Sequence, residues 1–386
     1  MSPVTPLPAG FRAYVANIGV KDTTEDLVVV ASDRPCPAAG MFTTSSFAGP
    51  SVIVSREHLS SPTAQAVVVI SKNANVATGA QGLADAREVV DRVAGAIGCR
   101  ASDVLIASTG VIGRHYPMAK VRAGLDAIPS TLPFVDTEQV ARGMMTTDTV
   151  PKVATASVGE ARIVGVAKGV GMIEPNMATM IAVLLTDALL DAADLDRIFR
   201  RVIERTFNCV SIDTDTSTSD TAIVMASGAA GAVDLETFEH GLYDVAVSLT
   251  KQIARDGEGA SKLIEVTVEQ AGSPAQAKRV AKAIVNSPLV KTAVHGADPN
   301  WGRVAMAIGK STTSDEVDQS KVVIRFGEQE VYPSTVGDAG LAALAAYMRR
   351  DEIHITATLA AGDASATVWG CDLTDGYVRI NADYTT

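Results

Sequence analysis

The sequence contains few aromatic residues and few cysteines. Aromatic side chains make up 4% of its 386 residues, whereas hydrophobic residues as a whole make up 47%. The core must therefore consist mainly of Val, Ile, Leu and Ala. The four cysteines, Cys36, Cys99, Cys209 and Cys371, lie far apart and form no CxxC pair. This spacing argues against a zinc or redox motif and predicts free, buried thiols in a reducing compartment.

Long apolar runs and an excess of positive charge are also missing. Residues 1–20 lack the basic segment and apolar run of a secretory signal. The most apolar stretch, Met177 to Leu190, is interrupted by Asp187 and is too short to span a bilayer. The net charge of −11 would repel phosphate backbones. We therefore expect a soluble, cytoplasmic protein without a membrane or nucleic-acid partner.

Strand-like and helix-like segments alternate along the chain, which predicts a mixed α/β protein. Short apolar runs predict strands at residues 66–70, 104–107, 163–167, 177–185, 221–225, 263–268, 304–308, 322–326, 353–359, 366–371 and 377–384. Apolar residues at helical spacing predict helices at residues 82–97, 193–206, 235–253, 275–285 and 340–348. The chain contains no internal repeat, low-complexity segment or Pro-rich linker that would separate domains.

The stretch KGVGMIEPNMATM, residues 168–180, carries the residues of greatest chemical interest. Gly169 and Gly171 permit sharp backbone turns. Ala178 is small and leaves its own carbonyl open to attack. Thr179 follows at the head of an apolar segment, and the end of a rigid strand is a good place to hold a nucleophile.

A threonine hydroxyl is a weak nucleophile and needs a base. The α-amine of Thr179 could serve, because its ordinary pKa of about 7.7–8.0 is close to the working pH. That amine becomes free only when the peptide bond between Ala178 and Thr179 is cut. The residues alone leave two interpretations open, a self-cutting threonine enzyme or an ordinary Gly-rich turn that leads into a core strand.

Five further blocks of sequence accompany this stretch. They are LIASTGVIGR at residues 105–114, MTTDT at 145–149, DTDTSTSDT at 213–221, DGEGASK at 256–262 and KTAVHGADPNWGR at 291–303. Each resembles a block of the ornithine acetyltransferase family (bifunctional glutamate N-acetyltransferases), and KGVGMIEPNMATM closely resembles that family's self-cleavage signature. The blocks run nearly from end to end of the chain, so chance does not explain the match.

The resemblance implies a fold and a mechanism. Thr179 would attack the carbonyl of Ala178 and divide the chain into an α piece, 1–178, and a β piece, 179–386, which stay intertwined. N-acetylornithine would then acetylate Thr179, and glutamate would take up the acetyl group in a ping-pong scheme without a cofactor or metal. The implied fold is a layered αββα-type sandwich with a smaller second lobe, and the implied assembly is α2β2.

The resemblance also implies roles for residues outside the cleavage signature. Thr109 and Gly110 match an oxyanion-hole pair. Lys168 would pair with a substrate carboxylate, and Glu258 would hold a substrate amine. Further substrate-binding positions are Thr146 (or its neighbour Thr147), Asn381 and the terminal Thr386. Without the resemblance, Thr109 and Glu258 are plain turn residues, and Lys168 is a solvated surface charge.

Two departures from the family pattern concern the substrate. Glu174 stands where many relatives carry a small residue, and it would place a carboxylate near the cut. Thr214 replaces the glycine of the family's DGDTS block. Both changes resemble those of relatives in specialised biosynthetic pathways. They leave the natural donor and acceptor open, so an amine of specialised metabolism is an alternative to glutamate.

Other functions and another candidate base also have to be weighed. An amidase or aminopeptidase of similar fold would use water in place of the acceptor amine. A silent binding protein is a third possibility, but the presence of Thr179, Thr109 and Gly110 argues against it. His295, in a polar segment with Asp298, is either half of a catalytic His–Asp pair or part of a loop that braces the site. We favour the bracing loop.

Overall fold

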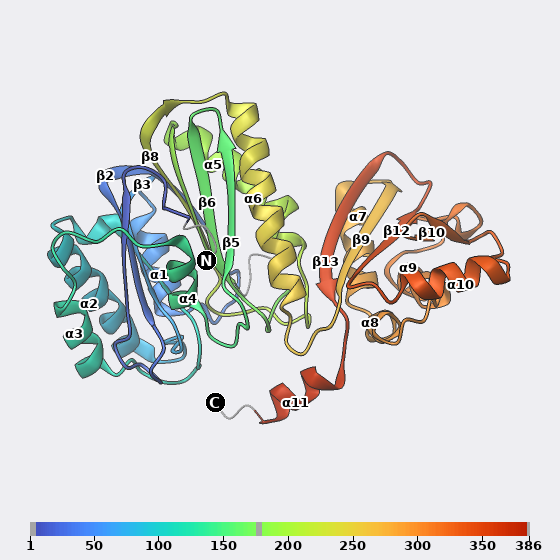
Figure 1. Ribbon diagram of the computed structural model, residues 1–386, viewed down its shortest axis with the longest axis horizontal. Helices are drawn as coiled ribbons and strands as arrows, with labels where there is room; N and C mark the ends of the chain where they lie inside the picture. Colours follow the sequence, from blue (N-terminus) through green and yellow to red (C-terminus); the bar gives the residue numbers. More distant parts are fainter. Residues whose placement is uncertain (1–4, 175–179, 384–386) are drawn as a thin grey trace.

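Two β-sheets organise the chain (Figure 1), an eight-stranded sheet followed by a five-stranded one. This computed structural model describes residues 5–174 and 180–383. The predictions for Ala178, Thr179 and Thr386 therefore fall outside the described residues.

The larger sheet consists of two halves that share strand β2 (Leu27–Phe42). The first half adds β1 (Phe11–Ala16), β3 (Thr63–Ile70) and β4 (Val104–Ser108). The second half adds β8 (Thr221–Ala232), β7 (Ile181–Leu189), β6 (Ala161–Lys168) and β5 (Lys152–Val158). A register shift between Ala31 and Cys36 marks the point where β2 passes from one half to the other.

The two halves pack face to face because side chains alternate across each strand. Val28 and Val30 of β2 share one core cluster with Val183 and Ile223 of the second half. Val29, between them in sequence, faces the opposite way into a cluster with the outer helices. The interior of the sandwich is therefore apolar, as the low aromatic content required, and is filled mainly by Val, Ile, Leu and Ala.

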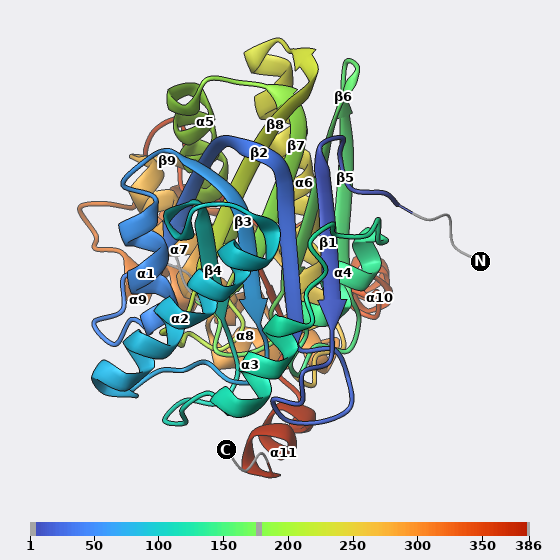
Figure 2. The ribbon, with the colours of Figure 1, turned by 90° about the vertical axis from the view of Figure 1, so that its left-hand side faces the viewer.

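Helices cover the outer faces of both halves. The first half is covered by α1 (Pro50–His58), α2 (Gly79–Ile97) and α3 (Met118–Asp126), which lie in front of it in Figure 2. The second half is covered by α5 (Ala192–Arg205) and α6 (Leu235–Arg255). The short helix α4 (Thr137–Met144) contributes Val140 and Met144 to the interior. The predicted αββα-type sandwich is confirmed.

A smaller second lobe follows, also as predicted (Figure 1). Its sheet has the order β11-β10-β12-β9-β13. The strands are β9 (Leu263–Ala271), β10 (Val323–Phe326), β11 (Gln329–Tyr332), β12 (Glu352–Thr358) and β13 (Ala364–Cys371). The helices are α7 (Pro274–Val285), α8 (Pro288–His295), α9 (Trp301–Ser311), α10 (Asp338–Tyr347) and α11 (Asp375–Asp383). Short 3-10 turns cover Ala101–Asp103, Phe207–Cys209 and Gln319–Lys321.

Some sequence predictions need correction. The apolar run at 304–308 is not a strand but part of helix α9, in which Val304, Ala307 and Ile308 form the buried side. The segment predicted as a strand at 377–384 instead belongs to helix α11, up to Asp383. The strand predicted at 177–185 begins at Ile181 and extends to Leu189. All four cysteines are free, and three are buried, whereas Cys99 is partly exposed. In the part of the chain that the structure describes, no helix is long and apolar enough to cross a bilayer.

Candidate active site

A cleft with a volume of about 360 Å³ opens where strands β4 and β6 end. Its walls come from the segments after β4, α4, β6 and α6, from the segment before β8, and from α11. Six of the predicted site residues line it, namely Thr109, Gly110, Thr146, Lys168, Glu258 and Asn381. The fold thus gathers at one place residues that are far apart in the sequence.

Thr109 and Gly110 form a turn that is fixed against the neighbouring loop. The Thr109 N–H donates to the carbonyl oxygen of Ile70 at 3.1 Å. Gly110 has φ of +126°, and a Cβ at this position would stand 2.2 Å from the carbonyl carbon of Lys72. Only glycine fits such a place, since any other residue would be strained and would collide with the backbone. The turn therefore holds its polar groups in a fixed position at the cleft.

Lys168, the last residue of β6, is a buried cation. Its side chain is deep in the cleft wall, with 5% of the residue exposed, and its Nζ donates to the Thr109 hydroxyl at 3.2 Å. Burial lowers the pKa of Lys168 below its ordinary value, although the neighbouring carboxylate of Asp148 opposes this shift. The interpretation of Lys168 as a solvated surface charge is therefore wrong. A buried ammonium beside a hydroxyl is suited to bind a carboxylate.

Glu258 faces Lys168 across the same cleft and is held by neutral groups. Its carboxylate accepts from the Thr147 hydroxyl at 3.3 Å and from the Asn381 amide at 2.9 Å. Gly171 leaves the space that the carboxylate occupies, because a Cβ there would stand 2.5 Å from Glu258 Oε2. Of the two candidate threonines at 146 and 147, it is Thr147 whose side chain touches Glu258.

A buried ion network fastens these loops together. Lys152 Nζ lies 2.7 Å from Asp148 Oδ1 and 2.6 Å from Asp256 Oδ2. Asp148 also accepts from the main-chain N–H groups of Thr146 at 3.1 Å and Gly169 at 2.7 Å. The network joins the loops after α4, β6 and α6, so that the lining residues keep their relative positions. None of these three ions is evident from its sequence pattern alone, although Asp148 and Asp256 lie in the MTTDT and DGEGASK blocks.

The segment that follows Lys168 is held by the loop at 211–216. The Asp213 carboxylate accepts from the main-chain N–H groups of Met172 at 2.6 Å and Ile173 at 2.7 Å. The next residue, Thr214, has φ of +71°. A β-branched residue in this region is strained, which explains why a glycine at this position would fit the backbone better.

The side chain of Glu174 is engaged outside the cleft. Its carboxylate accepts from Ser211 at 3.0 Å and from the Asn286 amide, and it lies 3.4 Å from Lys282 Nζ. Glu174 is also absent from the cleft lining. The expectation that this residue would alter the choice of substrate through a carboxylate in the site therefore receives no support from its position.

His295 pairs with Asp372 rather than with Asp298. Its Nδ1 lies 3.0 Å from Asp372 Oδ2, and the same carboxylate accepts from the Ser261 hydroxyl and from the Lys262 N–H. These contacts tie the loop after α6 to the end of β13. Since His295 does not line the cleft, the contacts support the interpretation of a bracing loop.

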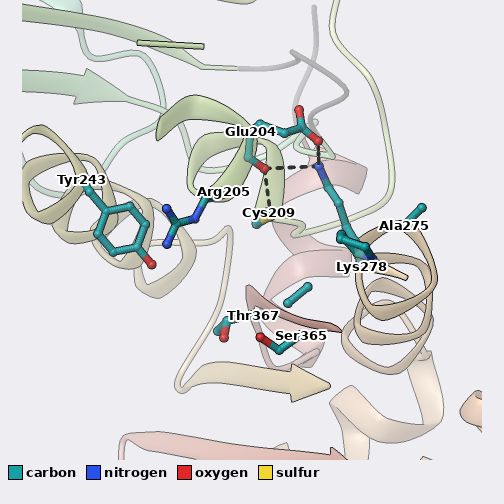
Figure 3. A pocket seen from close by; sticks show the side chains of 10 residues that line it. Glu204, Arg205, Cys209, Tyr243, Ala275, Lys278, Ser365 and Thr367 are labelled. Carbon is teal, nitrogen blue, oxygen red and sulfur yellow. Dashed lines mark hydrogen bonds and ion pairs between the residues drawn. The ribbon is translucent and has the colours of Figure 1, made fainter. Parts of the chain in front are cut away.

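A second pocket of about 410 Å³ lies between α5, α6, α7 and β13 (Figure 3). Lys278 forms an ion pair with Glu204 there, and the Arg205 guanidinium lies 4.8 Å from the centre of the Tyr243 ring. None of the predicted site residues lines this pocket.

Among the described residues, one trio could hold a metal ion: Glu265, Glu352 and His354. The Lys251 ammonium lies 2.7 Å from Glu265 and 3.2 Å from Glu352, and it already offsets their charge. The trio is on β9 and β12 and does not line the cleft.

Comparison with known proteins decides the family. A model described as the ArgJ family matches residues 12–386. The chain is 56% identical, over 98% of both proteins, to "Arginine biosynthesis bifunctional protein ArgJ 2" of Nostoc sp.. The chain belongs to the ArgJ family. The family that the motifs predicted is thereby confirmed.

A second relative matches the chain over its whole length, and a solved chain matches about half of it. This chain is 54% identical, over the whole of both proteins, to "Glutamate N-acetyltransferase Oat2" of Streptomyces clavuligerus. A solved chain of the arginine biosynthesis bifunctional protein ArgJ from Bacillus halodurans is 41% identical and covers 51% of this chain and 96% of that one, with a TM-score of 0.48.

Proposed function

We propose that this chain cuts itself before Thr179 and then transfers an acetyl group from N-acetylornithine to glutamate or a related amine. One observation carries the proposal: Thr109, Gly110, Lys168 and Glu258 surround a single cleft. The chain's relative in Streptomyces clavuligerus, 54% identical over its whole length, is named a glutamate N-acetyltransferase.

The neighbours of position 179 support its role as the nucleophile. Met180 follows it directly and is buried, and the Met180 carbonyl accepts from the Thr221 N–H at 3.0 Å. In the pairing of β6 with β7, Lys168 stands opposite Ile181. Residue 179 is therefore within two residues of the strand position opposite the cleft's buried lysine.

The two pieces of a cut chain would remain together. Strand β6 of the α piece pairs with β7 of the β piece, and β2 of the α piece pairs with β8 of the β piece. Both pairs contribute to the same apolar interior. A cut at 178/179 would thus leave the sandwich intact and create a new N-terminus two residues before β7. We further propose that two such units associate as α2β2.

The cleft groups suit each step of acetyl transfer. The α-carboxylate of N-acetylornithine would bind Lys168, and its side-chain amine would bind Glu258. The Thr179 hydroxyl would attack the acetyl carbon while its own α-amine takes the proton. Ornithine would leave with that proton, and an acetyl ester would remain on Thr179. The amine of glutamate would then attack the acetyl carbon, the bond from that carbon to the Thr179 oxygen would break, and a proton of the amine would restore the Thr179 hydroxyl as N-acetylglutamate leaves.

The Thr109–Gly110 turn would stabilise the negative oxygen that forms in both attacks. Because the Thr109 hydroxyl accepts a hydrogen bond from Lys168, its own proton is left to donate to this oxygen. The Gly110 N–H would supply a second donor. Thr146 and Asn381 would complete the substrate contacts, and Thr386 stays a prediction from the motif alone.

Intact mass spectrometry under denaturing conditions tests the proposal, with the wild type beside Thr179→Ala. We expect fragments 1–178 and 179–386 in the wild type and one full-length chain in the variant. The cut enzyme should then acetylate glutamate, or another amine in a panel, from N-acetylornithine. A wild type that stays uncut would overturn the proposal. Donor consumption at the same rate with and without an acceptor would show a hydrolase instead.

A further inference from the structure

Self-cleavage poses a chemical problem that acetyl transfer does not; the inference below rests on the function proposed above. Before the cut, the nitrogen of residue 179 belongs to a peptide bond. Its lone pair is delocalised into the carbonyl group, so it cannot take up a proton. The α-amine that serves as the base in acetyl transfer therefore does not yet exist. Another group must accept the proton of the Thr179 hydroxyl.

Asp220 is a buried acid near the start of β7, and its carboxylate lies near the Thr43 hydroxyl and the Met180 main chain without a hydrogen bond of normal geometry to either. It directly precedes β8 and is 1% exposed. Neither of its carboxylate oxygens has a hydrogen-bond partner among the residues that the structure describes. Its neighbour Thr221 donates to the Met180 carbonyl, which brings Asp220 close to the start of β7. Burying an unpaired carboxyl group costs free energy, and such a group in a native protein calls for an explanation.

The surroundings of Asp220 suit a proton acceptor. Burial raises the pKa of its carboxyl group well above the ordinary value, and the Thr43 hydroxyl, the Met180 main chain and the Lys168 ammonium offset only part of this rise. Lys168 is the charged group that acts on Asp220, and Asp148, Lys152 and Glu258 act in turn on Lys168. A carboxylate with a raised pKa holds a proton more firmly, so it is a stronger base when ionised.

We propose that Asp220 accepts the proton of the Thr179 hydroxyl during self-cleavage and passes it to the departing nitrogen. The hydroxyl oxygen bonds to the carbonyl carbon of Ala178 as its proton moves to Asp220. The bond between that carbon and the nitrogen then breaks, and the nitrogen takes the proton. The products are an ester between Ala178 and Thr179 and a free α-amine.

Water completes the reaction. Its oxygen bonds to the Ala178 carbonyl carbon, the ester bond to the Thr179 oxygen breaks, and one proton of the water restores the hydroxyl. The second proton of the water is released to the solvent, so fragment 1–178 ends in a carboxylate, and Asp220 is in its starting state. In the cut enzyme the amine of Thr179 serves as the base for acetyl transfer. Asp220 is therefore needed for self-cleavage and not for acetyl transfer.

The rate of cleavage after rapid cell-free synthesis tests this role. Denaturing mass spectrometry would follow the wild type, Asp220→Asn and Asp220→Glu at several pH values. We expect Asp220→Asn to slow cleavage by a factor of about 10²–10⁴, and Asp220→Glu to restore part of the rate. Since the base must be ionised, the wild-type rate should rise with pH through the raised pKa of Asp220 and then level off. That rise should be absent from Asp220→Asn.

Asp187→Asn is the matched control. Asp187 is a buried acid near the other end of β7, where it accepts from the N–H groups of Ala9 and Arg162 at 3.0 and 2.7 Å. We expect this variant to be cut at the wild-type rate. Circular dichroism would establish that each variant is folded.

The possible failures can be told apart. A folded Asp220→Asn protein that is cut at the wild-type rate would overturn the role of Asp220 and leave the proposed function standing. A wild type that stays uncut would overturn both the role of Asp220 and the proposed function. If Asp220→Asn does not fold, Asp220→Glu decides: a shifted pH profile supports the role, and an unchanged profile and rate overturn it.

Discussion

The cleft at the end of β6 and the pocket of Figure 3 contain similar groups in different arrangements. Each combines a lysine, a glutamate and at least one threonine hydroxyl. In the pocket, Lys278 and Glu204 form an ion pair, and their side chains are 22% and 58% exposed. In the cleft, Lys168 is buried and bound to a hydroxyl, while Glu258 is bound to Thr147 and Asn381. Charges paired with each other stabilise structure, whereas a buried lysine and a partly exposed glutamate that are held by neutral partners remain able to bind a substrate.

Substitution of the two lysines tests this difference most strongly. We expect Lys168→Met to lower kcat/KM for acetyl transfer by about 10³, since a buried partner of a charged group is worth several kcal/mol. Lys278→Met removes only a partly exposed ion pair, so its activity should stay within about twofold of the wild type. Steady-state kinetics on cut protein would measure both. An equal decrease in kcat/KM in the two variants would contradict the proposed functional difference between the cleft and the pocket.

The pH dependence of transfer sharpens the same comparison. Because the pKa of Lys168 is lowered, its positive charge is lost as the pH rises through that lowered value. We expect KM for the donor to increase on this alkaline limb, below the ordinary lysine pKa of about 10.4. Lys278→Met should show the same limb as the wild type. A KM that stays constant up to the ordinary lysine range would contradict the role of Lys168.

Removal of a threonine hydroxyl should affect kcat in the cleft and not in the pocket. Thr109→Ala removes one of the two proposed oxyanion donors and should lower kcat by about 10². Thr367, which lines the pocket, provides the matched change, and Thr367→Ala should leave kcat unaltered. Pre-steady-state measurement of the first acetyl transfer would show whether the loss lies in the chemical step, as expected for an oxyanion donor.

A larger side chain at the cleft should have a smaller effect, which we expect in KM for the donor. Gly171→Ala would place a methyl group 2.5 Å from the present position of Glu258 Oε2. The carboxylate has to move aside, so we expect KM for the donor to rise about tenfold, equivalent to about 1.4 kcal/mol. Gly95→Ala, in α2 with no atom near the new methyl group, should leave KM unchanged and slightly stabilise the protein.

Much of the fold could be predicted because local patterns and packing agree. Helix α2 and strand β4 lie where periodicity and a short apolar run predicted them. The run at 304–308 failed because a short apolar stretch fits a buried strand and a buried helix equally well. Strand β2 was not predicted, since Pro35, Pro37 and Gly40 interrupt its pattern. The sheet tolerates them because β2 changes partners there, between its pairing with β3 and its pairing with β8.

The candidate site, like the fold, could be predicted only in part. Thr109, Lys168 and Glu258 could be proposed because each stands inside a sequence block that resembles a known family. The contacts that position these residues could not be predicted, because such contacts join residues that are far apart in the sequence. Lys152 and Asp256, for example, are separated by 104 residues. Asp220 lies inside the DTDTSTSDT block, but only the structure shows that its carboxylate is buried and lacks a partner among the described residues.

The acetyl group itself provides the most direct measurement. Cut enzyme would be mixed with N-acetylornithine without an acceptor and quenched in acid. The mass of fragment 179–386 would then be measured, and the site of any added group would be located by peptide mass spectrometry. The mechanism predicts one acetyl group on the Thr179 hydroxyl, which disappears when glutamate is added and N-acetylglutamate forms. Steady transfer to glutamate with no acetyl group on Thr179 at any time point, even in the slowed Thr109→Ala variant, would contradict it.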